Sequence, residues 1–113
     1  MNQINNLSND AYQVTHIKLD DGSIVDMTLR YIPSTQQWLY DINHSLLTVT
    51  GRLLCNHLNV LRSFKNVIPF GVACSVTDGT EPLLQDDFIN GRVNIYILNA
   101  QDVQSIESII GSL

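Results

Sequence analysis

Apolar and polar side chains alternate without a break along residues 25–31, whose sequence is VDMTLRY. A period of two residues is typical of a β-strand that buries one face. Residues 13–19 also have strand character, and Asp20-Asp21-Gly22, a combination common in tight turns, separates the two runs. This part of the chain therefore predicts an antiparallel β-hairpin.

The length of the hairpin turn follows from burial. A two-residue loop would pair Ile17 with Asp26, whereas a three-residue loop over residues 20–22 pairs Ile17 with Val25. Because a shift of one residue moves every side chain to the opposite face, only the longer loop gives the hairpin a single apolar face. We therefore predict the three-residue loop, with Gly22 in the left-handed region that glycine enters without steric cost.

Further short strands are predicted along the rest of the chain, separated by segments rich in turn residues. They cover residues 38–43, 46–54, 70–76 and 92–98. Segment 58–64 fits either one short helical turn or a wrapped loop. About six short antiparallel strands without long helices between them predict an all-β fold, either a small barrel or a sandwich.

The last residues change to helical spacing. The apolar positions with this spacing are Val103, Ile106, Ile109, Ile110 and Leu113. We predict a short C-terminal helix over residues 102–112, with Asn99 as its cap and Gly111 at its end. Because a helix of about ten residues is unstable alone, the apolar stripe must lie on the body of the domain or on a partner, and we expect the body.

The length and composition indicate one globular domain over residues 1–113. Of the 113 residues 44% are hydrophobic and 15% charged, which is enough apolar material for a core and too little charge for a disordered chain. We expect residues 1–10, which are polar, to be flexible or added to a neighbouring element. Residues 11–98 then form the β body.

The charge and the apolar runs exclude some partners. The net charge is −5, and the six Lys and Arg residues are scattered singly, so the sequence does not indicate binding to nucleic acid. No apolar run approaches the ~20 residues of a membrane span. The first residues lack the basic start and apolar stretch of a signal peptide, so we expect a product of the cytoplasm.

Histidines and cysteines show no spacing of a known site. His16, His44 and His57 form no metal-binding motif, and Cys55 and Cys74 form no CxxC pair. We expect two buried free thiols. Cys55 and His57 are the one nucleophile and base that could be proposed, but the neighbouring leucines indicate burial, whereas a reactive cysteine needs an exposed, electropositive setting.

The remaining candidates are better explained by structure. The acidic pairs Asp20-Asp21 and Asp86-Asp87 lack calcium-loop spacing and suit turns, where Asp side chains bond the nearby backbone. Trp38 and Tyr40 could form a binding platform, and we expect them in the core. The sequence therefore predicts no catalytic, cofactor-binding or metal-binding residue, and no cofactor.

A set of short features follows in a fixed order between residues 11 and 98. They are Leu29-Arg30-Tyr31, Trp38 to Ile42, Asn59-Val60-Leu61, Asp78 to Pro82 and Gly91 to Tyr96. In this order and spacing the chain resembles the baseplate plug family, small proteins of contractile-tailed bacteriophages. It differs from that family's pattern at Asn56-His57, where the family tends to have a glycine, and in the helix that we predict from Asp102.

The resemblance implies a structural virion protein and not an enzyme. Such a plug is made in the host cytoplasm and sits in the tail baseplate, at the end of the tail tube, in contact with hub, spike or tube proteins. The threefold symmetry there implies a homotrimer or three copies in the assembly. The alternative that the residues leave open is a small β-barrel module that binds a ligand or peptide, in a bacterial or prophage protein.

Overall fold

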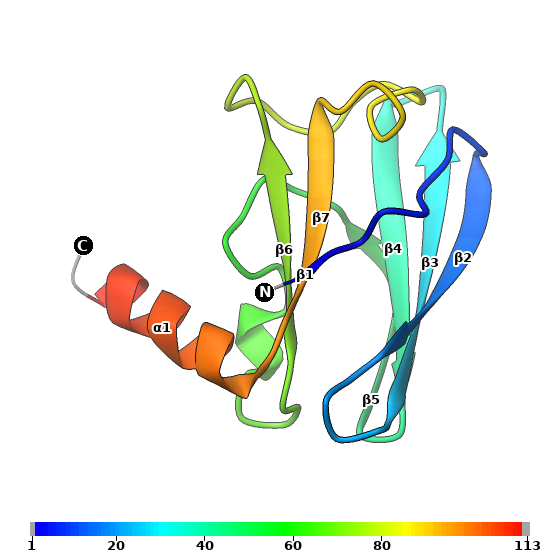
Figure 1. Ribbon diagram of the computed structural model, residues 1–113. Helices are drawn as coiled ribbons and strands as arrows, with labels where there is room; N and C mark the ends of the chain where they lie inside the picture. Colours follow the sequence, from blue (N-terminus) through cyan, green and yellow to red (C-terminus); the bar gives the residue numbers. More distant parts are fainter. Residues whose placement is uncertain (1, 112–113) are drawn as a thin grey trace.

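Two antiparallel sheets make up the body of the protein (Figure 1). The computed structural model describes residues 2–111. The four-stranded sheet has the order β2-β3-β4-β5, with β2 at Tyr12–Lys18, β3 at Ile24–Ile32, β4 at Gln37–His44 and β5 at Leu47–Leu53. The three-stranded sheet has the order β1-β7-β6, with β1 at Asn2–Gln3, β6 at Gly71–Val76 and β7 at Val93–Leu98. The predicted all-β class is confirmed.

The first hairpin has the predicted register. Ile17 lies opposite Val25 in the β2–β3 ladder, and the loop between the strands spans residues 20–22. Gly22 has a φ of 86°, in the left-handed region. The buried face of the hairpin therefore consists of the alternating apolar residues that the sequence pattern selected.

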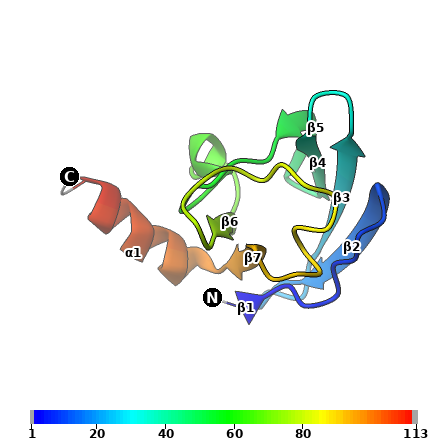
Figure 2. The ribbon, with the colours of Figure 1, turned by 90° about the horizontal axis from the view of Figure 1, so that it is seen from above.

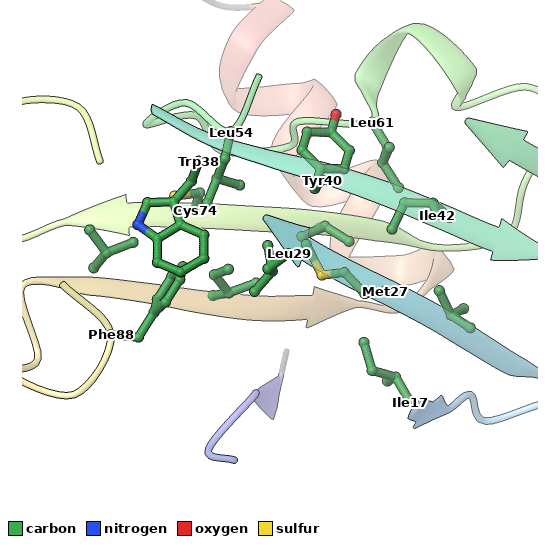
Figure 3. Packing of buried hydrophobic residues seen from close by; sticks show 14 of the residues in the cluster. Ile17, Met27, Leu29, Trp38, Tyr40, Ile42, Leu54, Leu61, Cys74 and Phe88 are labelled. Atoms are coloured by element: carbon green, nitrogen blue, oxygen red, sulfur yellow. The ribbon is translucent and has the colours of Figure 1, made fainter. Parts of the chain in front are cut away.

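The main core fills the space between the two sheets (Figure 3). Trp38 is completely buried, and its ring lies 4.7 Å from the Phe88 ring, centroid to centroid. Tyr40 is also buried, and its hydroxyl donates to the carbonyl of Val60 at 3.3 Å. The prediction that Trp38 and Tyr40 are core residues is confirmed, because neither side chain has an exposed face that could serve as a platform.

The β4–β5 pairing contains a bulge near Gly51. The register of the two strands shifts between Tyr40 and Ile42, and Gly51 has a φ of 67°. The Gly51 amide donates to Asp41 Oδ1 at 2.7 Å, and Arg30 Nη2 donates to the same oxygen at 2.9 Å. One carboxylate thus holds both the bulge and a neighbouring strand.

Residues 57–60 pair with the free edge of β6. His57 and Cys74 exchange two backbone hydrogen bonds of 3.0 Å, and the Val60 amide donates to the Val72 carbonyl at 2.7 Å. The buried side chain of Asn59 accepts a hydrogen bond from the Val72 amide at 3.2 Å. A Cβ on Gly71 would lie only 2.7 Å from the Asn59 side chain, so the close packing requires glycine at position 71. A short 3₁₀ helix, η1 at Arg62–Phe64, follows. Segment 58–64 therefore contains both forms predicted for it, a wrapped loop followed by one short helical turn.

The N-terminal residues cross from one sheet to the other. Of the two expectations for residues 1–10, addition to a neighbouring element holds for the first of them: β1 pairs with β7, and the Ile4 amide donates to the Ile95 carbonyl at 2.8 Å. Asn6 then accepts a hydrogen bond from Thr15 Oγ1 on β2 at 3.0 Å. Main-chain pairing of this kind leaves no apolar alternation in the sequence, so the pattern of polar residues could not reveal it.

The C-terminal helix α1 spans Ala100–Gly111 and projects from the side of the body (Figure 1). It begins two residues before the predicted start at 102, after the predicted cap: the Asp102 amide donates to Asn99 Oδ1 at 2.8 Å. Val103 and Ile106 are buried against the body, whereas Ile109 is 53% exposed. Leu113, the last member of the predicted stripe, lies outside the described residues.

Candidate protein-contact surfaces

The candidate nucleophile Cys55 is a half-buried thiol, and the candidate base His57 has a structural role. Cys55 is half-buried, and burial raises the pKa of its thiol. Nδ1 of His57 accepts a hydrogen bond from the Asn59 amide at 2.9 Å, so this nitrogen fixes a loop. Burial raises the pKa of Cys74 to about 12. Both cysteines are free thiols, as predicted, although only Cys74 is fully buried.

The other two histidines also contact neighbouring strands and loops. Nδ1 of His16 lies 2.5 Å from Asp26 Oδ1 on the outer face of the hairpin, and His44 hydrogen-bonds with Ser23 Oγ at 3.0 Å. Within residues 2–111, no group of three or more His, Cys, Asp or Glu side chains is placed to hold a metal ion. None of the described helices is long and apolar enough to cross a membrane.

One member of each acidic pair, Asp21 and Asp87, bonds the nearby backbone, as expected for turns. Asp21 accepts from the Ser23 amide at 2.9 Å. Oδ2 of Asp87, a fully buried residue, accepts from the amides of Leu83 and Leu84, both at 2.9 Å. Asp87 differs from a simple turn residue in one respect: the same Oδ2 lies 2.8 Å from Nη1 of Arg92.

Arg92 organises the long segment 77–92 between β6 and β7, which we call the crown. Its Nε donates to Asp78 Oδ2 at 3.1 Å, and Nη2 donates to the Glu81 carbonyl at 3.0 Å and to Thr80 Oγ1. With the contact to Asp87, one guanidinium thus joins both ends and the middle of the crown. The planar, five-donor geometry of arginine suits such a role, because the donors point in fixed directions.

The electrostatics of the crown follow from these contacts. The Thr80 hydroxyl and amide donate to Asp78 Oδ1 at 2.6 and 3.0 Å. These hydrogen bonds, together with the Arg92 guanidinium, lower the pKa of Asp78 to about 2. A carboxylate that accepts several donors is stabilised in its charged form, so Asp78 stays ionised at any physiological pH.

The body of the protein holds the crown through two aromatic side chains. The Tyr31 hydroxyl donates to the Leu83 carbonyl at 2.8 Å, and Trp38 Nε1 donates to the Leu84 carbonyl at 3.0 Å. Phe88 enters the core against Trp38. Figure 2 shows the result from above: the crown passes over the space between the two sheets.

The crown presents apolar side chains on an acidic background. Leu84 is 43% and Ile89 is 55% exposed, and Asp86 lies exposed between them in sequence. Asp86 accepts from Asn9 Nδ2 at 3.2 Å, which ties the crown to the N-terminal segment. Because the crown is fixed at many points, these side chains form a surface of defined shape, and we treat it as the first candidate contact surface.

The outer face of the four-stranded sheet is the second candidate. A row of neighbours crosses this face from β2 to β5, namely Tyr12, Arg30, Leu39 and Leu53. Its two ends are strongly exposed, Tyr12 at 66% and Leu53 at 51%, and Val14 beside Tyr12 is 45% exposed. Exposed apolar side chains that cluster on one face are typical of interaction sites.

Two of the clefts on the described part of the chain are large enough to consider as binding sites. One, of about 330 Å³, lies between the first hairpin turn at residues 19–21 and the junction of β7 with α1. Its size is at the lower end of the ~300–1,000 Å³ range of ligand pockets. The other, of about 440 Å³, is shallow and lies beside residues 55–66, where both Arg62 and Lys65 are already paired with Glu107 of α1.

These features define a small protein of two antiparallel sheets, whose polar residues hold a long loop over the open end of the core. The model of the family described as cyanophage baseplate Pam3 plug gp18 matches residues 1–100. The chain belongs to this family, and the family indicates a structural role in the baseplate of a phage tail. A search of the curated proteins finds no match. Most of α1 lies beyond the matched span.

The residues that carried the resemblance hold the architecture together. Arg30 and Asp41 hold the bulge, Asn59 holds residues 57–60 to β6, and Asp78 and Arg92 hold the crown. Sequence reasoning missed the role of Arg92, because its partners lie up to 14 residues away in the chain and follow no periodic spacing. The one signal that could have revealed it was the order of Asp78, Asp87 and Arg92 within a segment rich in turn residues.

Proposed function

We propose that this chain is a plug of a contractile phage tail baseplate that works by protein–protein contact and performs no catalysis. The match to the plug family over residues 1–100 carries this proposal. The exposed crown and the exposed outer face of the four-stranded sheet support it, because a structural part needs defined faces on which its neighbours can dock.

The crown and the outer face of the four-stranded sheet are the surfaces that we assign to these contacts. Leu84 and Ile89 supply apolar area on the crown, and Tyr12 and Leu53 supply it on the outer face. Burial of such side chains contributes about 25 cal/mol for each Å² removed from water. The rigidity that Arg92 gives to the crown lowers the ordering cost of docking, which otherwise reduces affinity.

The finer assignments follow the family. The partners are the hub, spike or tube proteins of the baseplate, and the assembly holds three copies or a homotrimer. The chain acts as one domain, is made in the host cytoplasm, and ends up in the tail of the virion. It needs no cofactor, and it binds neither nucleic acid nor membrane.

The alternative, a module that binds a small ligand or a peptide, would use the 330 Å³ cleft at the hairpin turn. Its polar lining includes Asp20, Asp21 and Asp102. However, Asp21 already accepts hydrogen bonds from Ser23, and Asp102 from the Asn99 amide at 3.2 Å, so these carboxylates have structural roles. The baseplate role remains the better supported function.

Co-expression with the tail hub protein tests the proposal. We expect the full-length chain to co-purify with it and Ile89→Asp to reduce the yield of complex, because a charge on the crown opposes docking. Val67→Asp is the matched control, since Val67 is 53% exposed and lies outside both surfaces. If the unmodified chain binds no hub, spike or tube protein, or if Val67→Asp reduces binding as much as Ile89→Asp, the proposal is wrong.

A further inference from the structure

The outer edge of β2 carries main-chain groups that have no partner among the described residues. The Leu19 amide donates to the Ser23 carbonyl at 2.8 Å at one end of the β2–β3 ladder, and the Tyr31 amide donates to the Ala11 carbonyl at 2.7 Å at the other. In an antiparallel ladder, residues that exchange hydrogen bonds alternate with residues that do not. The residues of β2 whose amides and carbonyls point away from β3 are therefore Tyr12, Val14, His16 and Lys18.

The other sheet edges are protected. β5 contains the bulge at Gly51, a device that disturbs pairing with another chain. The edge of β6 is covered by residues 57–60, and β1 is only two residues long. β2 has seven residues and contains neither a bulge nor a proline. It is the longest unprotected edge in the described part of the chain.

The N-terminal segment leaves this edge accessible. Asn6 contacts the buried side chain of Thr15, and the Ser8 amide donates to Gln13 Oε1 at 2.9 Å. Thr15 and Gln13 belong to the inner face of β2, because they alternate with the exposed residues Tyr12 and Val14. The segment therefore contacts the inner side of β2, and within residues 2–111 no backbone hydrogen bond joins the two.

We propose that β2 pairs with β2 of a second copy of this chain, antiparallel and with Val14 on the two-fold axis. In this register Tyr12 lies opposite His16 of the second copy, and the two Val14 side chains meet. Asp10, just before β2, comes beside Lys18 of the second copy, and the same pair recurs at the other end. The contact adds main-chain hydrogen bonds and apolar burial to two pairs of opposite charges.

The charge pattern favours this register over two others. In-register parallel pairing would place Lys18 beside Lys18, and an antiparallel register centred on Thr15 would place Asp10 beside Asp20 of the second copy. Like charges directly opposite each other destabilise a strand pair. The register centred on Val14 instead places Asp10 beside a lysine, and it uses the exposed apolar pair Tyr12 and Val14 at the centre of the contact.

This pairing goes beyond the baseplate role, and the edge and charges that support it do not depend on that role. Its place in the free protein before assembly rests on the proposed three copies, because a two-fold contact cannot satisfy all of three copies at once. In that state it covers a long edge that otherwise acts as a template for aggregation.

Sedimentation and light scattering on the purified full-length chain test the inference. We expect a concentration-dependent dimer of twice the 12.7 kDa chain mass. Val14→Pro removes an amide that faces away from β3, which edge strands tolerate, so this variant should keep its circular dichroism spectrum and be monomeric. The matched control, Val14→Thr, keeps the amide and should still dimerise. A monomeric wild-type chain at all concentrations, or a dimer in Val14→Pro, would overturn the proposal.

Charge reversal tests the register independently of any effect of proline on folding. Asp10→Lys and Lys18→Asp should each weaken dimerisation several-fold, because each places like charges at both ends of the contact. The double variant exchanges the two charges and should restore dimerisation. If the double variant is as weak as the single ones, or if neither single change has an effect, the register centred on Val14 is wrong.

Discussion

The first hairpin and the crown are both well-defined parts of this protein, but they are held in place by different means. In the β2–β3 hairpin, a ladder of seven residue pairs and one alternating apolar face fix every residue. The crown spans 77–92 without any strand, and depends on Arg92, Asp87 and the carbonyl contacts of Tyr31 and Trp38. Hence repeated contacts of one kind stabilise the hairpin, whereas specific polar contacts, each made once, stabilise the crown.

Substitutions in the two regions should therefore differ in how far their effects spread. A change on the hairpin should alter stability only in proportion to the local strain or lost burial, because neighbouring pairs remain. A change at one of the polar groups of the crown should loosen the whole segment, because each contact is used once.

Trp38→Ala should have the largest effect, because Trp38 on β4 packs against Tyr31 of the hairpin strand β3 and also holds the crown. It is completely buried in the core and also donates to the Leu84 carbonyl of the crown. We expect the free energy of unfolding to fall by about 3–5 kcal/mol, measured by urea denaturation. Leu53→Ala is the control, since Leu53 is 51% exposed and should cost at most about 0.5 kcal/mol. Equal costs for the two changes would contradict the assignment of Trp38 to the core.

Asp87→Ala should loosen the crown selectively. It removes the buried acceptor of the Leu83 and Leu84 amides and leaves the inward-facing donor of Arg92 without its carboxylate. We expect a loss of about 3 kcal/mol of stability, with faster hydrogen exchange in residues 77–92 than in the hairpin. Protection that falls equally in the crown and in β2–β3 would show that the two regions are not independently held.

Gly22→Val tests the hairpin turn and should have a smaller effect. A Cβ at Gly22 meets no atom within 4 Å, so the cost comes from the φ of 86° alone. A β-branched residue is strained there, and we expect destabilisation by about 1 kcal/mol or more. Gly22→Asn is the matched control and should cost less, because asparagine tolerates the left-handed region. Equal melting temperatures for the two variants would contradict the turn geometry.

The hairpin could be predicted from the sequence more completely than the crown, and the reason is physical. Burial on one face leaves a period of two in the sequence, so the pairing of Ile17 with Val25 follows from the residue pattern alone. The contacts of Arg92 leave no period. The bulge at Gly51 was missed for the same reason, because it depends on the hydrogen bond between the Gly51 amide and Asp41. For residues 1–10 the sequence left a flexible segment and a segment added to a neighbouring element open, and it did not show that β7 is the partner of β1.

In the C-terminal helix, too, the periodic features could be predicted from the sequence and the specific polar contact could not. Its apolar spacing and its Asn99 cap were predicted from the sequence, and Val103 and Ile106 pack on the body as expected. Nε of Arg62 donates to both carboxylate oxygens of Glu107, at 3.0 and 2.9 Å, and this contact joins residues far apart in the chain and could not be predicted. The contact surfaces could not be predicted from the sequence either, because the exposure of Ile89 and Tyr12 depends on where the crown and the sheet edges lie.

Lowering the pH from 4 toward 2 should weaken the contacts of Asp78 in the crown, and among the changes predicted here this one should have the smallest effect on stability. The pKa of Asp78 is lowered from 3.8 to about 2 by Thr80 and Arg92, so its contribution is complete above pH 4 and is lost as the pH falls toward 2. The Thr80 amide resonance should titrate with a midpoint near 2. In Thr80→Val the Asp78 carboxyl should titrate closer to 3.8. A wild-type midpoint near 3.8 would show that the hydrogen bonds do not form.

The most direct test of the baseplate role is an image reconstruction of the phage tail that carries this chain. We predict that the chain lies in the baseplate at the end of the tail tube, with the crown or the outer face of the four-stranded sheet against another tail protein. Absence of the chain from purified virions, or a position in which both surfaces face solvent, would contradict the account.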